Sequence, residues 1–236
     1  MKRIILMFIR NFFYLPSYAI NLFKYSRNVD KYPEKERYQF LQKIVYRANK
    51  GGNVKIENYG KENIPKESGF ILYPNHQGMY DMLALIDGCD HPLSVVSKKE
   101  AQNIPLLKEI FKVVKALFMD REDVRQSMKI IIEVTKEVSK GRNYVIFPEG
   151  TRSKNGNNVG EFKGGSFKAA TKAKCPIVPV ALIDSFKPFD TNSIKQVTVQ
   201  VHYLEPLLYE EYKEMNTNDI AEEVKRRIVE VIEKNK

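Results

Sequence analysis

Short apolar runs and amphipathic stretches alternate along most of the chain. Strands are expected where apolar runs or strict alternation occur, at 54–59, 70–73, 93–96, 116–119, 144–147, 177–183 and 196–203. Helices are expected where apolar residues recur at helical spacing, at 79–86, 104–114, 122–139 and 218–233. Strands interleaved with helices predict an α/β fold, in which a mixed, largely parallel sheet is flanked by helices. The NGNNVG run at 155–160 is the clearest flexible loop.

The first 52 residues follow a different pattern and predict two helices. The longest stretch without a charged residue, 11–23, would span roughly 20 Å as a helix, which is short of the roughly 30 Å hydrocarbon core. Arg10 interrupts the apolar run, Pro16 is expected to kink a helix, and no signal-peptide cleavage site follows. A second helix is expected after Pro33, ending at Gly51. Its apolar face comprises Phe40, Leu41, Ile44, Val45 and Ala48.

Charge is concentrated in this N-terminal arm, residues 1–52. The chain has 39 Lys+Arg against 29 Asp+Glu, a net charge of +10, and residues 1–50 hold eleven of the basic residues but three acids. Basic residues beside apolar and aromatic anchors are typical of a segment bound at a phospholipid surface. The anchors are Phe8, Phe12, Phe13, Tyr14, Leu15, Tyr18, Leu22 and Phe23.

Packing of both helices on the rest of the protein is the alternative. The two interpretations weigh equally for the second helix, whereas membrane contact is favoured for the first. No nucleic-acid-binding motif accompanies the basic residues, so nucleic acid is not an expected partner. The predicted organisation is therefore a membrane-associating helical arm at 1–52 and a domain at 53–236.

The cysteines and histidines limit the chemistry. Cys89 and Cys175 form no CxxC pair, which indicates a reducing, cytosol-facing compartment. His91 and His202 are isolated and belong to no metal-binding pattern, so no metal site is expected. No GxSxG motif is present, and no nucleophile stands where covalent catalysis would need one.

A histidine and an aspartate follow the expected strand at 70–73. His76 and Asp81 are five residues apart, about 140° around a regular helix, so they could meet only if His76 lies in the turn before the helix. A carboxylate beside an imidazole fixes its tautomer and stabilises the imidazolium, as general-base chemistry requires. On spacing alone, a histidine satisfied by local hydrogen bonds and an aspartate favoured by the helix dipole is the preferred interpretation.

Two further segments suit an anionic ligand. In the loop at 147–153, Gly150 frees the backbone, while Thr151 and Arg152 offer donors for phosphate oxygens. The loop lacks the Walker pattern, and an ordinary polar turn is the commoner explanation of such a composition. Arg121 would occupy the first turn of the next helix if Asp120 caps it, where the helix dipole disfavours a cation. Either an anionic partner bound by Arg121 or exposure of its side chain to solvent would explain an arginine at this position.

Taken together, four ordered blocks resemble those of the 1-acyl-glycerol-3-phosphate acyltransferases, a family of glycerolipid acyltransferases. The blocks are Asn75-His76 with Asp81, Phe118-Met119-Asp120-Arg121, Phe147-Pro148-Glu149-Gly150-Thr151-Arg152-Ser153, and Ile177-Val178-Pro179-Val180.

The resemblance implies a role for each block, and the fourth, with Pro179, would support the acyl-donor side of the site. His76 would be the general base and Asp81 its orienting partner. The acceptor phosphate would lie near Arg121 and the segment Glu149, Gly150, Thr151 and Arg152. The implied reaction transfers an acyl chain from acyl carrier protein or coenzyme A to the sn-2 hydroxyl of lysophosphatidic acid, giving phosphatidic acid, with no cofactor beyond this co-substrate. Peripheral or monotopic attachment to the cytoplasmic face of the cell membrane is expected.

Two alternatives stay open. A sister acyltransferase would use glycerol 3-phosphate or another lysophospholipid. A non-catalytic membrane-binding module would keep the basic arm and lack acyl transfer.

Overall fold

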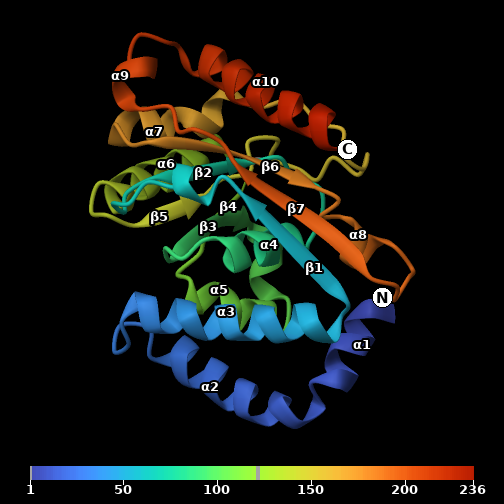
Figure 1. Cartoon of the computed structure of the whole chain (residues 1–236). Coiled ribbons are helices and arrows are strands. Elements are labelled where there is room, and N and C mark those ends of the chain that lie inside the picture. The colour runs from blue at the N-terminus through green and yellow to red at the C-terminus, as the bar shows by residue number, and fades with distance from the viewer. Residues whose placement is uncertain (1, 121–122) are drawn as a thin grey trace.

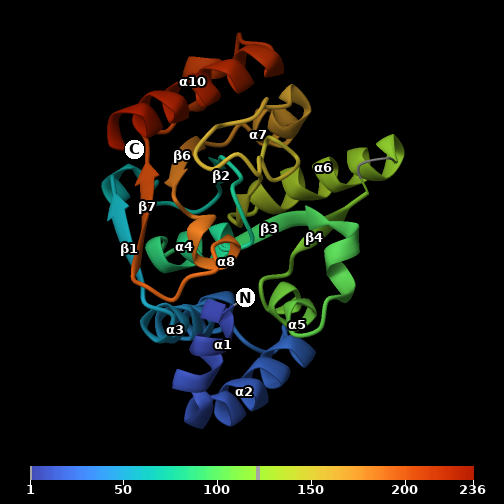
Figure 2. The ribbon, with the colours of Figure 1, turned by 90° about the vertical axis from the view of Figure 1, so that its right-hand side faces the viewer.

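A seven-stranded sheet divides the computed structural model, which describes residues 2–120 and 123–236, into two helical layers (Figure 1). Its strands are β1 (Val54–Tyr59), β2 (Ile71–Pro74), β3 (Leu93–Lys98), β4 (Leu117–Met119), β5 (Asn143–Val145), β6 (Ile177–Ile183) and β7 (Val197–Tyr203). Their order is β1-β7-β6-β2-β5-β3-β4, and Figure 2 shows β1 and β7 on one side of the sheet with β3 and β4 on the other. Every neighbouring pair is parallel except β6 and β7. The predicted α/β fold with a mixed, largely parallel sheet is confirmed.

Helices cover both faces of the sheet. One face carries α3 (Glu34–Gly51), α4 (Asp81–Gly88) and α5 (Leu107–Val113), and the other carries α6 (Val124–Val138), α7 (Lys168–Ala173) and α10 (Thr217–Asn235). Shorter helices are α8 (Lys187–Asp190) and α9 (Tyr209–Tyr212). A further pair, α1 (Lys2–Arg10) and α2 (Leu15–Arg27), lies outside α3 and α5 as an additional layer (Figure 1).

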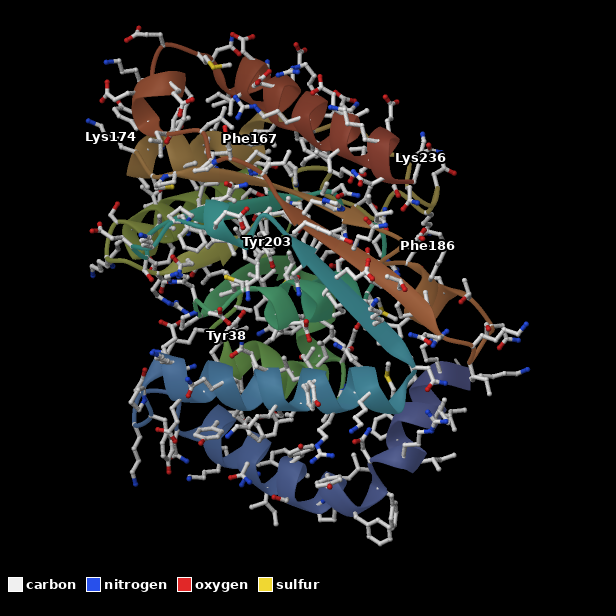
Figure 3. All side chains as sticks on the ribbon, in the orientation of Figure 1. Tyr38, Phe167, Lys174, Phe186, Tyr203 and Lys236 are labelled. Carbon is white, nitrogen blue, oxygen red and sulfur yellow. The ribbon has the colours of Figure 1, made fainter. Side chains whose placement is uncertain are left out.

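The sheet separates two hydrophobic cores because successive side chains of a strand point to opposite faces. On β2, Leu72 belongs to the core under α3 and α4, whereas Ile71 and Tyr73 belong to the core under α6, α7 and α10. Figure 3 shows the same division for Tyr38 and Phe167, which lie on opposite sides of the sheet. A central strand that is buried on both faces reads as a continuous apolar run, which is why 70–73 predicted one.

Each strand and helix expected after residue 53 is present, with shifts of a few residues at the ends. Val124 does not belong to the apolar face of its helix, because it is exposed while Val134 and Val138 are buried. It is the first residue of α6, directly after the capping residue Asp123. The division into an arm at 1–52 and a domain at 53–236 stays a prediction.

Residues 2–52 form three α-helices, with a short 3₁₀ turn between the first two, where two helices were expected. The chain breaks between α1 and α2 at residues 11–14, and Pro16 lies in the first turn of α2 rather than at a kink. A proline is tolerated there because first-turn N–H groups have no partner within the helix. Pro33 is the capping residue before Glu34, so α3 begins directly after Pro33 and ends at Gly51, as predicted.

The helices of the arm differ in how far their apolar side chains are exposed. Phe40, Leu41 and Val45 of α3 are buried against the sheet layer, so the second expected helix packs on the domain. Leu22 is buried in the same core and is not an outward anchor. In contrast, α1, α2 and the turn between them project a band of large apolar side chains away from the body (Figure 3). They are Ile5, Phe8, Ile9, Phe12, Phe13, Tyr14, Ile20 and Phe23. Among the described residues, no helix combines the length and the apolarity needed to cross a bilayer.

Candidate active site

The site candidates gather at one edge of the sheet. Strands β2, β3, β4, β5 and β6 all run in the same direction, so their carboxyl ends meet at that edge. His76 follows β2, the loop with Glu149 follows β5, and residues 184–185 follow β6. Because β2 lies between β5 and β6, these three loops are direct neighbours. The carboxyl edge is where α/β sheets carry their binding sites.

His76 and Asp81 form a hydrogen bond in the one arrangement that their five-residue spacing allows. His76 lies in the turn before α4, and Asp81 is the first residue of that helix. The imidazole Nδ1 is 2.7 Å from Asp81 Oδ2. Because a carboxylate oxygen accepts, Nδ1 carries the proton and Nε2 keeps its lone pair. An imidazole in this tautomer can take a proton at Nε2.

Asp81 is completely buried and is held by more donors than His76 alone. Its Oδ2 accepts from the backbone N–H of Gln77 at 2.7 Å, and the N–H of Gly78 lies 3.1 Å from both carboxylate oxygens. Its Oδ1 accepts from the Ser185 hydroxyl at 2.5 Å. A buried carboxylate is tolerable only with such partners, and here they fix its orientation toward His76.

The His76 ring is clamped on one side and open on the other. It stacks on Phe147, with ring centroids 4.1 Å apart and planes at 28°. Its side chain is 21% exposed, and no described residue hydrogen-bonds to Nε2. The nitrogen that bears the lone pair is therefore the one available to a substrate.

The loop after β5 is tied to the His76 backbone in two places. Glu149 Oε1 accepts from the His76 N–H at 2.7 Å, and Ser153 N–H donates to the His76 carbonyl at 2.9 Å. The other oxygen of Glu149 accepts from the Gly160 N–H at 3.0 Å. Burial raises the pKa of Glu149 above its usual range, although both backbone donors oppose the rise. The Glu149 carboxylate thus joins three loop segments, and its predicted contact with substrate stays a prediction.

The residues between Glu149 and Ser153 are the donors expected to meet a phosphate. Gly150 has φ +71°, a conformation that favours glycine, and the Lys163 ammonium lies beside it. Thr151 is exposed and Arg152 is partly buried. In the described part of the chain, the Arg152 guanidinium has no hydrogen-bond or ion-pair partner. These groups lie beside His76, while their role in binding stays a prediction.

The third candidate segment differs from its expected structure. The cap of α6 is Asp123, whose side chain accepts from the Gln126 N–H at 3.0 Å, and not Asp120. Asp120 instead belongs to the turn after β4, where its backbone N–H donates to Gln126 Oε1. Arg121 lies outside the described residues. Strands β5 and β3 separate β4 from β2 in the sheet, so this segment approaches the site from two strands away.

Four further polar residues complete the site: Asn75, which the sequence placed in the first block without giving it a role, and three that it did not single out. Asn75 pairs with both the N–H and the carbonyl of Leu182, at 2.7 and 3.0 Å, and so joins the ends of β2 and β6. The remaining three are Gln77, Asn157 and Ser185. Asn75, Gln77 and Ser185 are buried polar residues, which is the signal that could have found them, but burial is not readable from sequence.

Neither cysteine is available to His76 as a nucleophile. Cys89 and Cys175 are both buried, and burial raises the pKa of each thiol to about 12, so neither is a thiolate near neutral pH. Within the described ranges, no group of three or more His, Cys, Asp or Glu side chains could hold a metal ion. The arrangement suits direct activation of a substrate hydroxyl by the imidazole.

The comparisons with known proteins place this α/β protein in an enzyme class. The family model described as Acyltransferase matches residues 55–183, more than half of the chain. The chain belongs to this acyltransferase family, which confirms the resemblance drawn from the four blocks. The predicted enzyme class, an acyltransferase, is confirmed with it.

Two bacterial relatives are described as 1-acyl-sn-glycerol-3-phosphate acyltransferases, the second of them as a probable one. The chain is 32% identical to the 1-acyl-sn-glycerol-3-phosphate acyltransferase of Borreliella burgdorferi over 185 residues, which are 76% of this chain and 72% of that protein. It is 27% identical to the probable 1-acyl-sn-glycerol-3-phosphate acyltransferase of Mycoplasma pneumoniae, over 91% of this chain and 85% of that protein.

A solved structure shares the fold. It is the 1-acyl-sn-glycerophosphate (LPA) acyltransferase PlsC from Thermotoga maritima, with a TM-score of 0.79 and 22% sequence identity. The match covers 98% of this chain and 95% of that chain, so it extends over the N-terminal helices as well as the sheet.

Proposed function

We propose that this acyltransferase transfers an acyl chain from acyl carrier protein or coenzyme A to the sn-2 hydroxyl of lysophosphatidic acid, giving phosphatidic acid. The observation that carries the proposal is the buried Asp81 carboxylate that holds His76 with Nε2 free, beside a loop in which the Arg152 guanidinium has no partner among the described residues. The names of the relatives support the acceptor, because those proteins are described as acting on 1-acyl-sn-glycerol-3-phosphate.

In this mechanism His76 Nε2 removes the proton from the acceptor hydroxyl while the oxygen attacks the thioester carbonyl. The new C–O bond forms as the C–S bond breaks, and the leaving thiolate takes the proton back from the imidazolium. Asp81 keeps Nδ1 protonated and stabilises the imidazolium between these two steps. The transfer is direct and forms no acyl-enzyme, because the two cysteines are buried with raised thiol pKa values.

The acceptor phosphate would lie on the loop at 150–152, with Arg121 contributing from the segment after β4. The Arg152 fork can bind two phosphate oxygens, and the Lys163 ammonium adds positive charge beside Gly150. The Glu149 carboxylate accepts from the backbone N–H groups of His76 and Gly160, so both of its oxygens are engaged within the protein.

The test compares acceptors with the purified chain. An acyl thioester is offered with lysophosphatidic acid, glycerol 3-phosphate or lysophosphatidylcholine, each in mixed micelles, and the products are separated by mass. Phosphatidic acid formed from lysophosphatidic acid supports the proposal. Preferred acylation of another acceptor would indicate a sister acyltransferase, and no transfer to any acceptor would favour the membrane-binding module.

Arg152→Gln is expected to raise the KM for lysophosphatidic acid about 10- to 100-fold, since a hydrogen bond to a charged group contributes roughly 1.5–3 kcal/mol. The maximal rate should change little, because the phosphate is bound equally in ground and transition states. Lys154→Gln is the matched control, an exposed cation two residues along the same loop. A fall in maximal rate with unchanged KM would remove Arg152 from the phosphate site.

We infer further that the arm attaches the enzyme peripherally to the cytoplasmic face of the membrane, where an amphiphilic acceptor resides. The exposed aromatic side chains of α1 and α2 would enter the head-group region, while the basic residues meet anionic lipids.

Replacing Phe12 and Phe13 together by serine is expected to weaken binding to anionic vesicles by about 100-fold or more. The two rings are 66% and 92% exposed, and burial of one such ring contributes about 1.5–3 kcal/mol. Co-sedimentation with vesicles measures the loss. Ile132→Ser, an exposed apolar residue of α6 on the opposite face of the sheet, is the control. Equal binding of the Phe12/Phe13 variant and the parent protein would exclude α1 and α2 as the anchor.

A further inference from the structure

We propose that Ser185 is a positioning residue of this site, which sets the charge that Asp81 presents to His76. The proposal rests on the general-base function proposed for His76 and adds a third member to the pair. Ser185 comes from the turn after β6, a segment outside the blocks on which the family resemblance was drawn. It follows Asp184 and precedes Phe186, which Figure 3 labels beside α8.

The contacts determine where the Ser185 proton goes. Ser185 Oγ is 2.5 Å from Asp81 Oδ1 and 3.0 Å from Gln77 Oε1. A hydroxyl has one proton, and a carboxylate at the shorter distance is the stronger acceptor. The Ser185 hydroxyl therefore donates to Asp81, on the oxygen opposite the one that accepts from His76. The series runs from the Ser185 hydroxyl through the Asp81 carboxylate to His76 Nδ1.

Gln77 holds Ser185 in place. Its Oε1 accepts from the Ser185 backbone N–H at 2.9 Å, and its Nε2 donates to the Leu182 carbonyl at 2.9 Å and to Asn157 Oδ1 at 2.8 Å. These partners allow one orientation of the amide, because a backbone N–H must face an oxygen and a carbonyl must face the NH₂ group. Asn157 also pairs with both the backbone N–H and the carboxylate of Asp184, so the loop at 155–160 is fastened to the same turn.

Full burial makes the Ser185 hydroxyl influential. Ser185 and Asp81 are both at 0% exposure, so water does not replace the hydroxyl as a donor to Oδ1. A hydrogen bond to a carboxylate stabilises its charge and weakens its attraction for other protons. With Ser185 present, part of the Asp81 charge is engaged by the hydroxyl at Oδ1, while Oδ2 accepts the Nδ1 proton of His76. Removal of the hydroxyl would leave more of that charge to act on the imidazole.

Other charged groups border the pair and are unchanged by a substitution at Ser185. Glu149 faces it from the loop after β5. From the β6 turn and α8 come the Asp184–Lys187 ion pair, at 2.6 Å, and Asp190, whose carboxylate lies beside Gly78. Any change in the pH dependence of the variant is therefore assignable to the missing hydroxyl.

The decisive variant is Ser185→Ala, assayed for acyl transfer to lysophosphatidic acid across pH. The acidic limb of the profile is expected to move up by about one pH unit, because Asp81 then stabilises the imidazolium more strongly. At pH values below this limb, the activity of the variant is expected to be about tenfold lower than that of the parent protein. At high pH the two activities should be similar, with unchanged KM. Ser94→Ala is the matched control, since Ser94 is also fully buried and its hydroxyl donates to the Lys115 carbonyl at 3.0 Å, in β3.

A structural role alone would lower activity equally at all pH values, as we expect for Ser94→Ala if it loosens the fold. An equal loss in Ser185→Ala, or an unmoved limb, overturns the proposal while the proposed reaction stands. A measurement made without substrate distinguishes failure of the Ser185 proposal from failure of the proposed reaction. The ring signals of His76 in NMR should titrate at higher pH in Ser185→Ala, with His91 and His202 as internal references. If lysophosphatidic acid is not acylated at all, an unmoved His76 titration still overturns the role of Ser185, and a moved one supports it.

Discussion

The Asp81→Asn variant is expected to lose about three to four orders of magnitude in turnover while keeping its fold. Asparagine has the shape of aspartate and keeps one acceptor oxygen, so the turn that contains Gln77 and Gly78 retains a partner. What disappears is the negative charge that stabilises the imidazolium when His76 takes the acceptor proton. The loss therefore falls on kcat, measured with saturating acceptor, and leaves KM nearly unchanged.

Orientation of the new amide adds to the effect of the lost charge. If its NH₂ group faced His76, the ring would have to accept at Nδ1, and Nε2 would carry the proton and cease to be a base. Asp87→Asn is the control, because Asp87 is a partly buried carboxylate of the same helix that bonds the amides of Asn49 and Asn58. Comparable activity of the Asp81→Asn and Asp87→Asn variants would separate Asp81 from the chemistry.

His76→Ala is expected to lower acyl transfer by at least about 10²- to 10⁴-fold, the usual contribution of a general base. The fold should survive, because Asp81 keeps its donors from Gln77, Gly78 and Ser185 and remains satisfied when the imidazole is removed. Thermal unfolding followed by circular dichroism checks this directly. The loss of activity should not be recovered at high concentrations of lysophosphatidic acid.

His91→Ala serves as the matched histidine control. His91 lies near Ser68 and edge-on to Phe70, at the opposite end of the strands from the His76 site. Its removal should leave acyl transfer at the level of the parent protein. Full activity in His76→Ala would remove the imidazole from the mechanism.

The local part of the site was predictable only in part. The five-residue spacing of His76 and Asp81 allowed one arrangement in which they meet, a turn followed by a helix, and the structure has it. Spacing alone favoured two residues that do not pair, and that preference was wrong; the resemblance of the blocks was what paired them. Apolar runs likewise located the strands, since burial on both faces leaves few polar residues in them.

The long-range part was not predictable. Ser185 is 104 residues from Asp81, and their contact depends on β6 lying beside β2, which strand patterns do not reveal. The sequence prediction placed the start of α6 too early, because Asp120 and Asp123 are both good capping residues. In the structure Asp123 is the cap. The spacing of apolar residues in the arm did not separate Leu22, which is buried, from Phe23, which is exposed.

The fold explains why these loops share one site. Parallel strands deliver their following loops to a common edge, and β2 stands between the strands that carry the other two loops. Buried side chains then fix the loops: Asn75 joins the end of β2 to β6, and Glu149 joins the β5 loop to His76. The exposed groups, His76 Nε2 and the residues at 150–152, are left to face a substrate.

The most direct test follows a labelled acyl chain from its thioester to lysophosphatidic acid in mixed micelles, with the parent protein beside His76→Ala. Direct transfer predicts that the label appears in phosphatidic acid with the parent protein, at a rate lower by at least about 10²-fold with the variant, and never on the protein itself. Equal labelling of phosphatidic acid by both proteins, or label retained on the polypeptide, would contradict base-catalysed transfer at His76.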